Sequence, residues 1–368
     1  MQTRRQIAIA LLTSLLLAGC ATTSHDIQKN EAPDQAIVTA ARAEMVMLYR
    51  VESIHYKLAV AGESLCLNKQ GMIPVLLQTN PVTLPPAERT VLWRVFGLDE
   101  SIRIGVIVDT DAAPGVKIGQ RLTSVTGEAA SPGDMAAARK LMEIAKTESS
   151  VTLGFDDVDH KIALKRGCAS YVVLAASAAP DSGAMDGRST YTIPLVALAK
   201  SDDELAYIIA REVAMNGFGY ADKVRYATYV GAAVNGAARG VFGIFGALLP
   251  QVGAPAAMKA ARIAYEHDAD KGAFALMVKA GFDPGVVPAF WERNSGIAEP
   301  VGYVLKPDAE RKSWWRQALG GLPPRPVAVI NETRQKSGAT PPSASANAVS
   351  VVRVKPGDGP MVMQVLEK

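Results

Sequence analysis

The chain has 368 residues, which is long for one domain and sufficient for two. Its 39 Lys and Arg residues nearly balance its 36 Asp and Glu residues, so a net charge of +3 predicts no nucleic-acid partner. A hydrophobic fraction of 49% excludes a disordered protein and provides ample material for a core. The 3 cysteines and 4 histidines include no Cys-x-x-Cys pair, which excludes zinc knuckles and thioredoxin-type redox motifs.

Residues 1–19 predict a signal peptide. Arg4 and Arg5 precede an apolar run, residues 7–18, that is too short to cross a bilayer of about 30 Å as a helix. The run leads into Leu17-Ala18-Gly19-Cys20, which resembles the bacterial lipoprotein box. The resemblance implies that acyl chains on Cys20 anchor the mature chain in a membrane. Because no aspartate follows Cys20, it also implies the periplasmic side of the outer membrane; an ordinary anchor with a chance cysteine is the alternative.

Residues 20–36 form a polar linker, and the amphipathic segment 37–58 predicts a scaffold helix. With Cys20 acylated, Cys66 and Cys168 are an even pair in an oxidising compartment, where disulfides persist. We therefore expect them to form a disulfide. Two buried free thiols are the alternative.

Most of the segment that ends at Cys168, residues 95–168, is predicted to form a small β-rich domain. Runs at 102–108, 151–155 and 160–164 predict strands, the last two joined by a turn at 156–159, and residues 135–145 have helical spacing.

Residues 116–128, Val-Lys-Ile-Gly-Gln-Arg-Leu-Thr-Ser-Val-Thr-Gly-Glu, resemble the signature of bacterial PDZ domains, with Gln120 and Thr126 in place of the usual Asp and Asn. The resemblance implies that a peptide or protein C-terminus binds by strand addition, with its carboxylate near Phe96, Gly97 and Leu98. A β-rich insert without a ligand is the alternative.

Two later helices carry the candidate chemistry. Ser201-Asp202-Asp203-Glu204 is a capping box that begins a helix ending near Gly217. Helical spacing places Ile208, Arg211, Glu212 and Met215 on one face of it. A second helix is predicted from Ala256 to Ala280, with Glu266, Asp270 and Met277 on one face.

These helices resemble peptidase family M-forty-eight, the gluzincin group that contains the CAAX prenyl protease and bacterial envelope metallopeptidases. The likeness lies in four segments, residues 202–206, 211–215, 266–272 and 280–284, and extends over residues 35–320. It implies an α+β fold: a mainly helical, zincin-like metallopeptidase domain with a small β-sheet, formed by residues 37–94 and 169–320. The PDZ-like domain, residues 95–168, interrupts it.

In that family two histidines four residues apart bind zinc, and the glutamate after the first is the catalytic base. A glutamate on the second helix is the third ligand, and an aspartate four residues later orients a zinc-bound histidine. When this family pattern is placed on the present sequence, Glu212 stands at the position of the base and Glu266 at the position of the third ligand. Asp270 stands at the position of the orienting aspartate. Arg211 and Met215 replace both histidines.

These replacements argue against a hydrolytic zinc site. Arginine does not deprotonate to become a ligand, and methionine is a soft ligand. Lys306 stands where many members have a further histidine, and His267 does not share an inward face with Glu266. We therefore expect no cofactor and no metal, or at most a metal at Glu266. Glu212 then has no metal-activated water to deprotonate and is expected to have no catalytic role.

The vacated site predicts a specific contact. Arg211 points inward, where an unpaired charge is costly, and Glu266 and Asp270 are the carboxylates that it should face. We expect its guanidinium to replace the dication and to tie the two helices together by charge-assisted bonds. The alternative is that Arg211 turns out to solvent.

The sequence thus predicts a periplasm-facing outer-membrane lipoprotein, a non-catalytic pseudoprotease that binds envelope proteins or peptides. One alternative is an active metalloendopeptidase that uses zinc in a rearranged site; another is a purely structural lipoprotein.

The glycine-rich segment 230–255 predicts a packed hairpin or superficial membrane contact. Residues 321–368 predict a flexible tail.

Overall fold

The computed structural model describes residues 35–80, 86–132, 136–175, 180–223, 254–296 and 307–321. The fold is mixed α and β: about half of these residues are helical, and the strands form several small sheets. No helix within these ranges is both long and apolar enough to cross a membrane. Cys20 with the predicted signal peptide, Lys306, most of the glycine-rich segment and the tail after residue 321 lie outside them.

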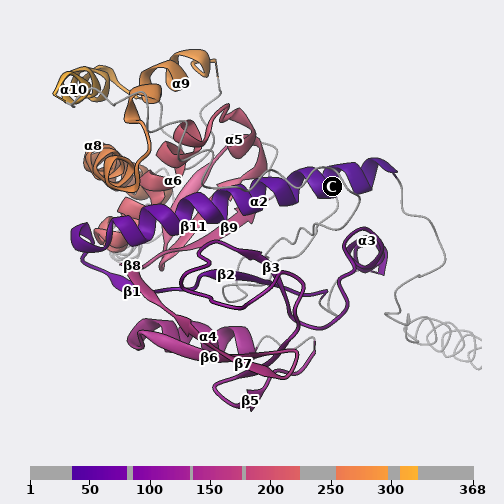
Figure 1. Cartoon of the computed structure of the whole chain (residues 1–368). Helices are drawn as coiled ribbons and strands as arrows, with labels where there is room; N and C mark the ends of the chain where they lie inside the picture. The colour runs from indigo at the N-terminus through magenta and orange to yellow at the C-terminus, as the bar shows by residue number, and fades with distance from the viewer. Residues whose placement is uncertain are drawn as a thin grey trace, which may run out of the picture.

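The long helix α2, Gln35–Ala61, runs through the middle of the molecule (Figure 1). On one side of it lie the helices α6, Asp202–Gly217, and α8, Ala254–Ala280, with α9, Val287–Arg293, and α10, Ala309–Gly320. Leu48, Ile209 and Leu276, from α2, α6 and α8, belong to one buried apolar cluster. The helix predicted over residues 37–58 is therefore present and forms part of the core.

Local sequence signals account for the ends of α6 and α8. The Ser201 hydroxyl accepts a hydrogen bond from the Glu204 amide at 3.2 Å, and the Glu204 carboxylate accepts one from the Lys200 amide at 2.7 Å. The first bond satisfies an amide that a helix start leaves without a partner, and the second ties the residue before the N-cap to the first turn. At the end of α8, Gly281 has a φ of 83°, which glycine adopts without strain. The predicted start of α6 and end of α8 are confirmed.

Two small sheets lie beside the helical part. The first has the order β10-β11-β9: β11, Arg188–Thr192, is antiparallel to β10, Ser182–Met185, and parallel to β9, Tyr171–Ala175. The short helix α5, Ile193–Leu198, continues directly from β11. In the second sheet, β1, Lys69–Met72, pairs antiparallel with β8, Lys165–Cys168. Both β10 and β11 contact α6, so the first sheet covers one side of that helix.

The β-rich part on the other side of α2 has a four-stranded sheet of order β5-β4-β6-β7 (Figure 1). Its strands are β4, Leu122–Val125, β5, Glu128–Ala129, β6, Ser150–Phe155, and β7, Val158–Ala163, with α4, Ala136–Thr147, packed against them. The turn between β6 and β7 consists of Asp156 and Asp157, with φ of 47° and 65°. The turn is tighter than the predicted one over residues 156–159 because aspartate tolerates the left-handed region, which a two-residue hairpin requires.

The elements that pack together do not follow the boundary expected at residue 95. Strand β2, Val75–Gln78, precedes that boundary but pairs antiparallel with β3, Arg103–Ile107. Val75 and Leu77 belong to the same buried cluster as Leu141 and Leu153 of the β-rich part. In contrast, helix α3, Pro86–Phe96, shares a separate cluster with the first turns of α2.

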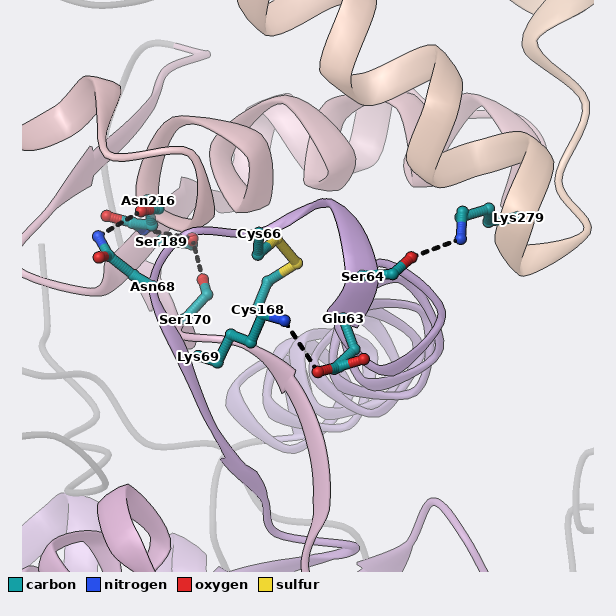
Figure 2. The surroundings of a disulfide bond; sticks show 10 residues. All are labelled: Glu63, Ser64, Cys66, Asn68, Lys69, Cys168, Ser170, Ser189, Asn216 and Lys279. Carbon is teal, nitrogen blue, oxygen red and sulfur yellow. Dashed lines mark hydrogen bonds and ion pairs between the residues drawn. A yellow bond between two sulfur atoms is a disulfide. The ribbon is translucent and has the colours of Figure 1, made fainter.

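The predicted disulfide between Cys66 and Cys168 is present. Figure 2 shows it where the short 3-10 helix η2, Glu63–Leu65, leaves α2 and where β8 ends. Ser64 accepts a hydrogen bond from Lys279 of α8 at 2.7 Å, and Asn68 donates one to the Asn216 carbonyl of α6 at 3.2 Å. The disulfide therefore lies where α2, α6, α8 and the β1–β8 sheet meet.

The disulfide also explains the glycine at the end of α6. A Cβ atom at Gly217 would lie 2.5 Å from the Cys66 sulfur, which leaves no room for any side chain there. Gly272 of α8 has the same role against α6, because a Cβ atom there would lie 2.8 Å from the Cβ of Ala214. Small residues thus allow these elements to approach closely.

Replacing both cysteines by alanine should lower the free energy of unfolding by about 4–5 kcal/mol, because the disulfide constrains a loop of about a hundred residues in the unfolded chain. Urea denaturation of the oxidised protein and of the double variant measures this difference. Chemical reduction of the wild type is the matched control and should give a similar loss. If the oxidised and reduced proteins unfold at the same urea concentration, the disulfide does not stabilise this fold.

Candidate functional site

The predicted contact between α6 and α8 is a buried ion-pair site. Glu266 and Asp270 lie one turn apart on α8, and Arg211 lies opposite them on α6; the three residues are 2%, 0% and 3% exposed. Arg211 forms an ion pair with Glu266, and its Nε donates to Asp270 Oδ1 at 3.0 Å. The expected contact of Arg211 with both carboxylates is therefore present, and its side chain is not turned out to solvent.

A second arginine, Arg311 of α10, completes the site. Its Nε donates to Asp270 Oδ2 at 2.7 Å, and its Nη2 donates to Asp270 Oδ1 at 3.1 Å. Its Nη1 lies 3.6 Å from Glu266 Oε2, and the side chain is buried. We call Arg211, Arg311, Glu266 and Asp270 the arginine–carboxylate cluster. Two guanidinium groups balance two carboxylates, so its net charge is zero.

Arg311 is not among the residues that the sequence motifs indicate, although charge balance offers a signal for it. One arginine facing two buried carboxylates leaves an excess negative charge, which is costly in a protein interior. A further cation on a neighbouring element was therefore required. Arg311 follows Asp308, whose carboxylate caps α10 by accepting a hydrogen bond from the Arg311 amide at 2.8 Å. That capping pattern is recognisable in the sequence and places Arg311 in the first turn of a helix.

Aromatic residues complete the hydrogen bonding of Asp270. The Tyr207 hydroxyl donates to Asp270 Oδ1 at 3.0 Å, and the Trp315 indole donates to Oδ2 at 3.1 Å. The Trp291 indole donates in turn to the Tyr207 hydroxyl at 3.2 Å. Asp270 thus accepts hydrogen bonds from α6 and α10 together, and it holds three helices in one arrangement.

The charge states of the cluster follow from its contacts. Burial alone would raise the pKa of Asp270, but Arg211 and Arg311 outweigh burial and hold the pKa of this carboxyl below its usual range. Burial and the charge of Asp270 raise the pKa of Tyr207 to about 12, so its hydroxyl keeps its proton and remains a donor. Asp270 is therefore ionised and paired at neutral pH.

The residue at the base position, Glu212, faces a different element. It is fully buried, and its Oε1 accepts a hydrogen bond from the Ser182 hydroxyl of β10 at 2.8 Å. Met215, one turn later on α6, is also fully buried and packs with Ala269 of α8. Glu212 is thus bound to the β10–β11–β9 sheet, whereas Arg211 is bound to Glu266 and Asp270 of α8.

The residues at the expected metal position do not fit a zinc ion. A catalytic zinc needs about three protein ligands that supply electron pairs. Beside Glu266 the structure places two guanidinium groups, which repel a cation and have no pair to donate. Within the described part of the chain, no group of three His, Cys, Asp or Glu side chains lies close enough to hold a metal. His267 packs edge-on against Trp314 with ring centres 5.6 Å apart, and His55 and His160 lie on α2 and β7.

The segment expected to bind a peptide carboxylate has another role. Gly97 has a φ of 65° and ends α3: its amide donates to the Trp93 carbonyl at 2.9 Å, and the Leu98 amide donates to the Leu92 carbonyl at 3.1 Å. Phe96 and Leu98 are buried against α2. Because both amides already have partners in this helix cap, Phe96, Gly97 and Leu98 do not present a carboxylate-binding loop in this conformation.

Comparison of the chain with protein-family models, with curated proteins and with solved structures finds no match. The resemblance to peptidase family M-forty-eight and to PDZ domains therefore stays a prediction from the motifs.

Replacing Arg211 by Met leaves the cluster with one excess buried negative charge. We expect the free energy of unfolding to fall by about 3–5 kcal/mol, because a buried charge loses its partner. Urea denaturation measures the loss. The double variant Arg211→Met with Glu266→Gln restores a net charge of zero and should recover part of it. A loss below about 1 kcal/mol in the single variant, as for an exposed pair, would show that the cluster does not hold the helices together.

Proposed function

We propose that this protein is a lipid-anchored, periplasm-facing outer-membrane lipoprotein whose metallopeptidase-like domain has become a non-catalytic binding module for envelope proteins or peptides. The observation that carries the proposal is the occupation of the expected metal position by Arg211 and Arg311, both of which contact Glu266. A zincin-like arrangement of α6 and α8, with a PDZ-like β-rich part, is the fold that the sequence motifs imply.

The charges of the cluster explain why loss of the ligand histidines need not destabilise such a fold. A zinc ion supplies two positive charges to carboxylates between two helices, and two guanidinium groups supply the same charge to Glu266 and Asp270. Arginine also offers several donors in a planar fork, which suits two carboxylates better than lysine does. The cluster therefore supports a substitution that retains the scaffold while removing the Lewis acid.

Two observations support the location in the cell envelope. The disulfide between Cys66 and Cys168 is typical of compartments outside the cytoplasm. The lipoprotein box at Cys20 gives the third cysteine a separate role, as the attachment point of the acyl chains. A lipidated chain with a polar linker would hold the folded part close to the membrane surface.

Strand β7 is the place that we assign to partner binding. Peptides bind by strand addition where a strand has an unpaired edge. The edge of β3 next to β2 is already used by the chain itself, whereas β7 ends its sheet and pairs with β6 alone among the described strands. At the far end of β7 the Ala163 amide donates to the Ala112 carbonyl at 2.9 Å, so we assign strand addition to the end that begins at Val158. Val158 at the start of β7 is 56% exposed and offers an apolar contact beside that edge.

The activity proposal predicts that the purified protein contains no stoichiometric zinc and that Glu212→Gln leaves any residual proteolysis unchanged. Metal analysis and a casein-cleavage assay give both readouts. The matched control is the double variant Arg211→His with Met215→His, which creates a His-x-x-x-His pair next to Glu266 and should gain zinc affinity over the wild type. Stoichiometric zinc in the wild type, together with loss of proteolysis in Glu212→Gln, would establish the alternative of an active metalloendopeptidase.

The partner proposal predicts that extended apolar peptides bind the soluble protein equally well with a free or an amidated C-terminus, because the amides of Gly97 and Leu98 are used within the chain. Val158→Lys should weaken this binding. Val46→Lys, at a similarly exposed apolar residue on α2, should not. Fluorescence anisotropy with labelled peptides measures both effects. A strong preference for the free C-terminus would restore the carboxylate loop, and no binding at all would favour a purely structural lipoprotein.

A further inference from the structure

A cavity of about 320 Å³ lies between the helical part and the β-rich part, away from the arginine–carboxylate cluster. Helix α2, the β1–β2 segment, α4, β9 and the turn between β10 and β11 all contribute to its lining. Figure 1 shows α2 passing between these two parts of the molecule. Its volume is at the lower end of the range for small-molecule sites.

Two titratable residues of α2 line the cavity together. Glu52 and His55 are three residues apart, so they lie on the same face of the helix. His55 is 2% exposed, and its Nε2 has no hydrogen-bond partner among the described residues. Buried polar atoms normally have a partner, so this nitrogen is available for a group that enters the cavity.

The interior of the cavity is polar but uncharged at neutral pH. Burial lowers the pKa of His55 to about 4 and raises the pKa of Glu52 to about 8. Glu52 is therefore a carboxylic acid that can donate a hydrogen bond, and the imidazole of His55 is neutral. The charged residues of the lining, Glu143, Lys146 and Asp186, are exposed and lie at its rim.

The rest of the lining is more apolar than polar. Methionine, isoleucine, leucine, valine and alanine side chains from several elements contribute most of it, and the uncharged residues Tyr56, Gln70, Ser170 and Tyr171 contribute the remainder with two glycines. An occupant must therefore carry an apolar body. A charged head would have to leave water without meeting an opposite charge inside, which is unfavourable.

We propose that this cavity is a binding site for a small neutral molecule that has an apolar body and an amide or hydroxyl head, with the head held by Glu52 and His55. The site is independent of the arginine–carboxylate cluster and of the assignment of the protein as a pseudoprotease. Its specificity follows from two hydrogen-bonding groups on one face of α2 within a lining that is otherwise mainly apolar.

Three probes of similar shape test the charge requirement: benzamide, benzoate and benzamidine, which are neutral, anionic and cationic at pH 7. We expect benzamide to shift the NMR signal of the His55 ring and to raise the melting temperature. We expect the two charged probes to bind at least about 10-fold more weakly, because their heads lose hydration without gaining a counter-charge. Equal binding of all three probes, or no binding of benzamide, would overturn the proposal.

Substitutions locate the binding. His55→Leu should abolish the benzamide effect while leaving the melting temperature of the free protein equal or higher, because it removes a buried polar atom that has no partner. Val172→Phe, which fills the cavity, should also abolish binding. His160→Gln, on β7 and outside the cavity, is the matched control and should bind as the wild type does. Unchanged benzamide binding in both His55→Leu and Val172→Phe would place the probe elsewhere and overturn the assignment.

Discussion

The arrangement of helices in this protein depends on the arginine–carboxylate cluster between α6, α8 and α10. Four charged side chains are removed from water there, and desolvation of that kind is offset only when each charge meets an opposite one in good geometry. Asp270 satisfies this condition: it accepts hydrogen bonds from Arg211, Arg311, Tyr207 and Trp315. Each donor fixes the position of its helix, so the cluster selects one packing of the three helices over others.

The disulfide is a second constraint, and it acts at the C-terminal end of α6. It joins the chain after α2 to the end of β8, and Gly217 packs directly against it. Every residue of α6 from Glu204 to Gly217 is buried. The Ser201 cap fixes the start of this helix and the disulfide fixes its end, while Arg211 and Glu212 in its interior are paired or hydrogen-bonded.

Local signals predicted the elements well, whereas contacts between distant segments were only partly predictable. Ser201 and Glu204 identified the start of α6, and the even pair Cys66 and Cys168 identified the disulfide. The contact of Arg211 with Glu266 and Asp270 followed from helical spacing and the cost of buried charge. Arg311 was missed because its role depends on a third helix distant in the sequence. The pairing of β2 with β3 was not predicted either, because α3 separates the two strands in the sequence and no tight turn indicates that they pair.

We propose that the guanidinium groups of Arg211 and Arg311 take the place that a metal ion would have beside Glu266. Anomalous diffraction at the zinc edge, from crystals grown in the presence of zinc, distinguishes the two arrangements. We expect density for both guanidinium groups against the Glu266 and Asp270 carboxylates and no anomalous peak within coordination distance of Glu266, about 2 Å. An anomalous peak bound to Glu266, with Arg211 displaced from it, would show that this position binds a metal and would favour the alternative of a metal-dependent peptidase.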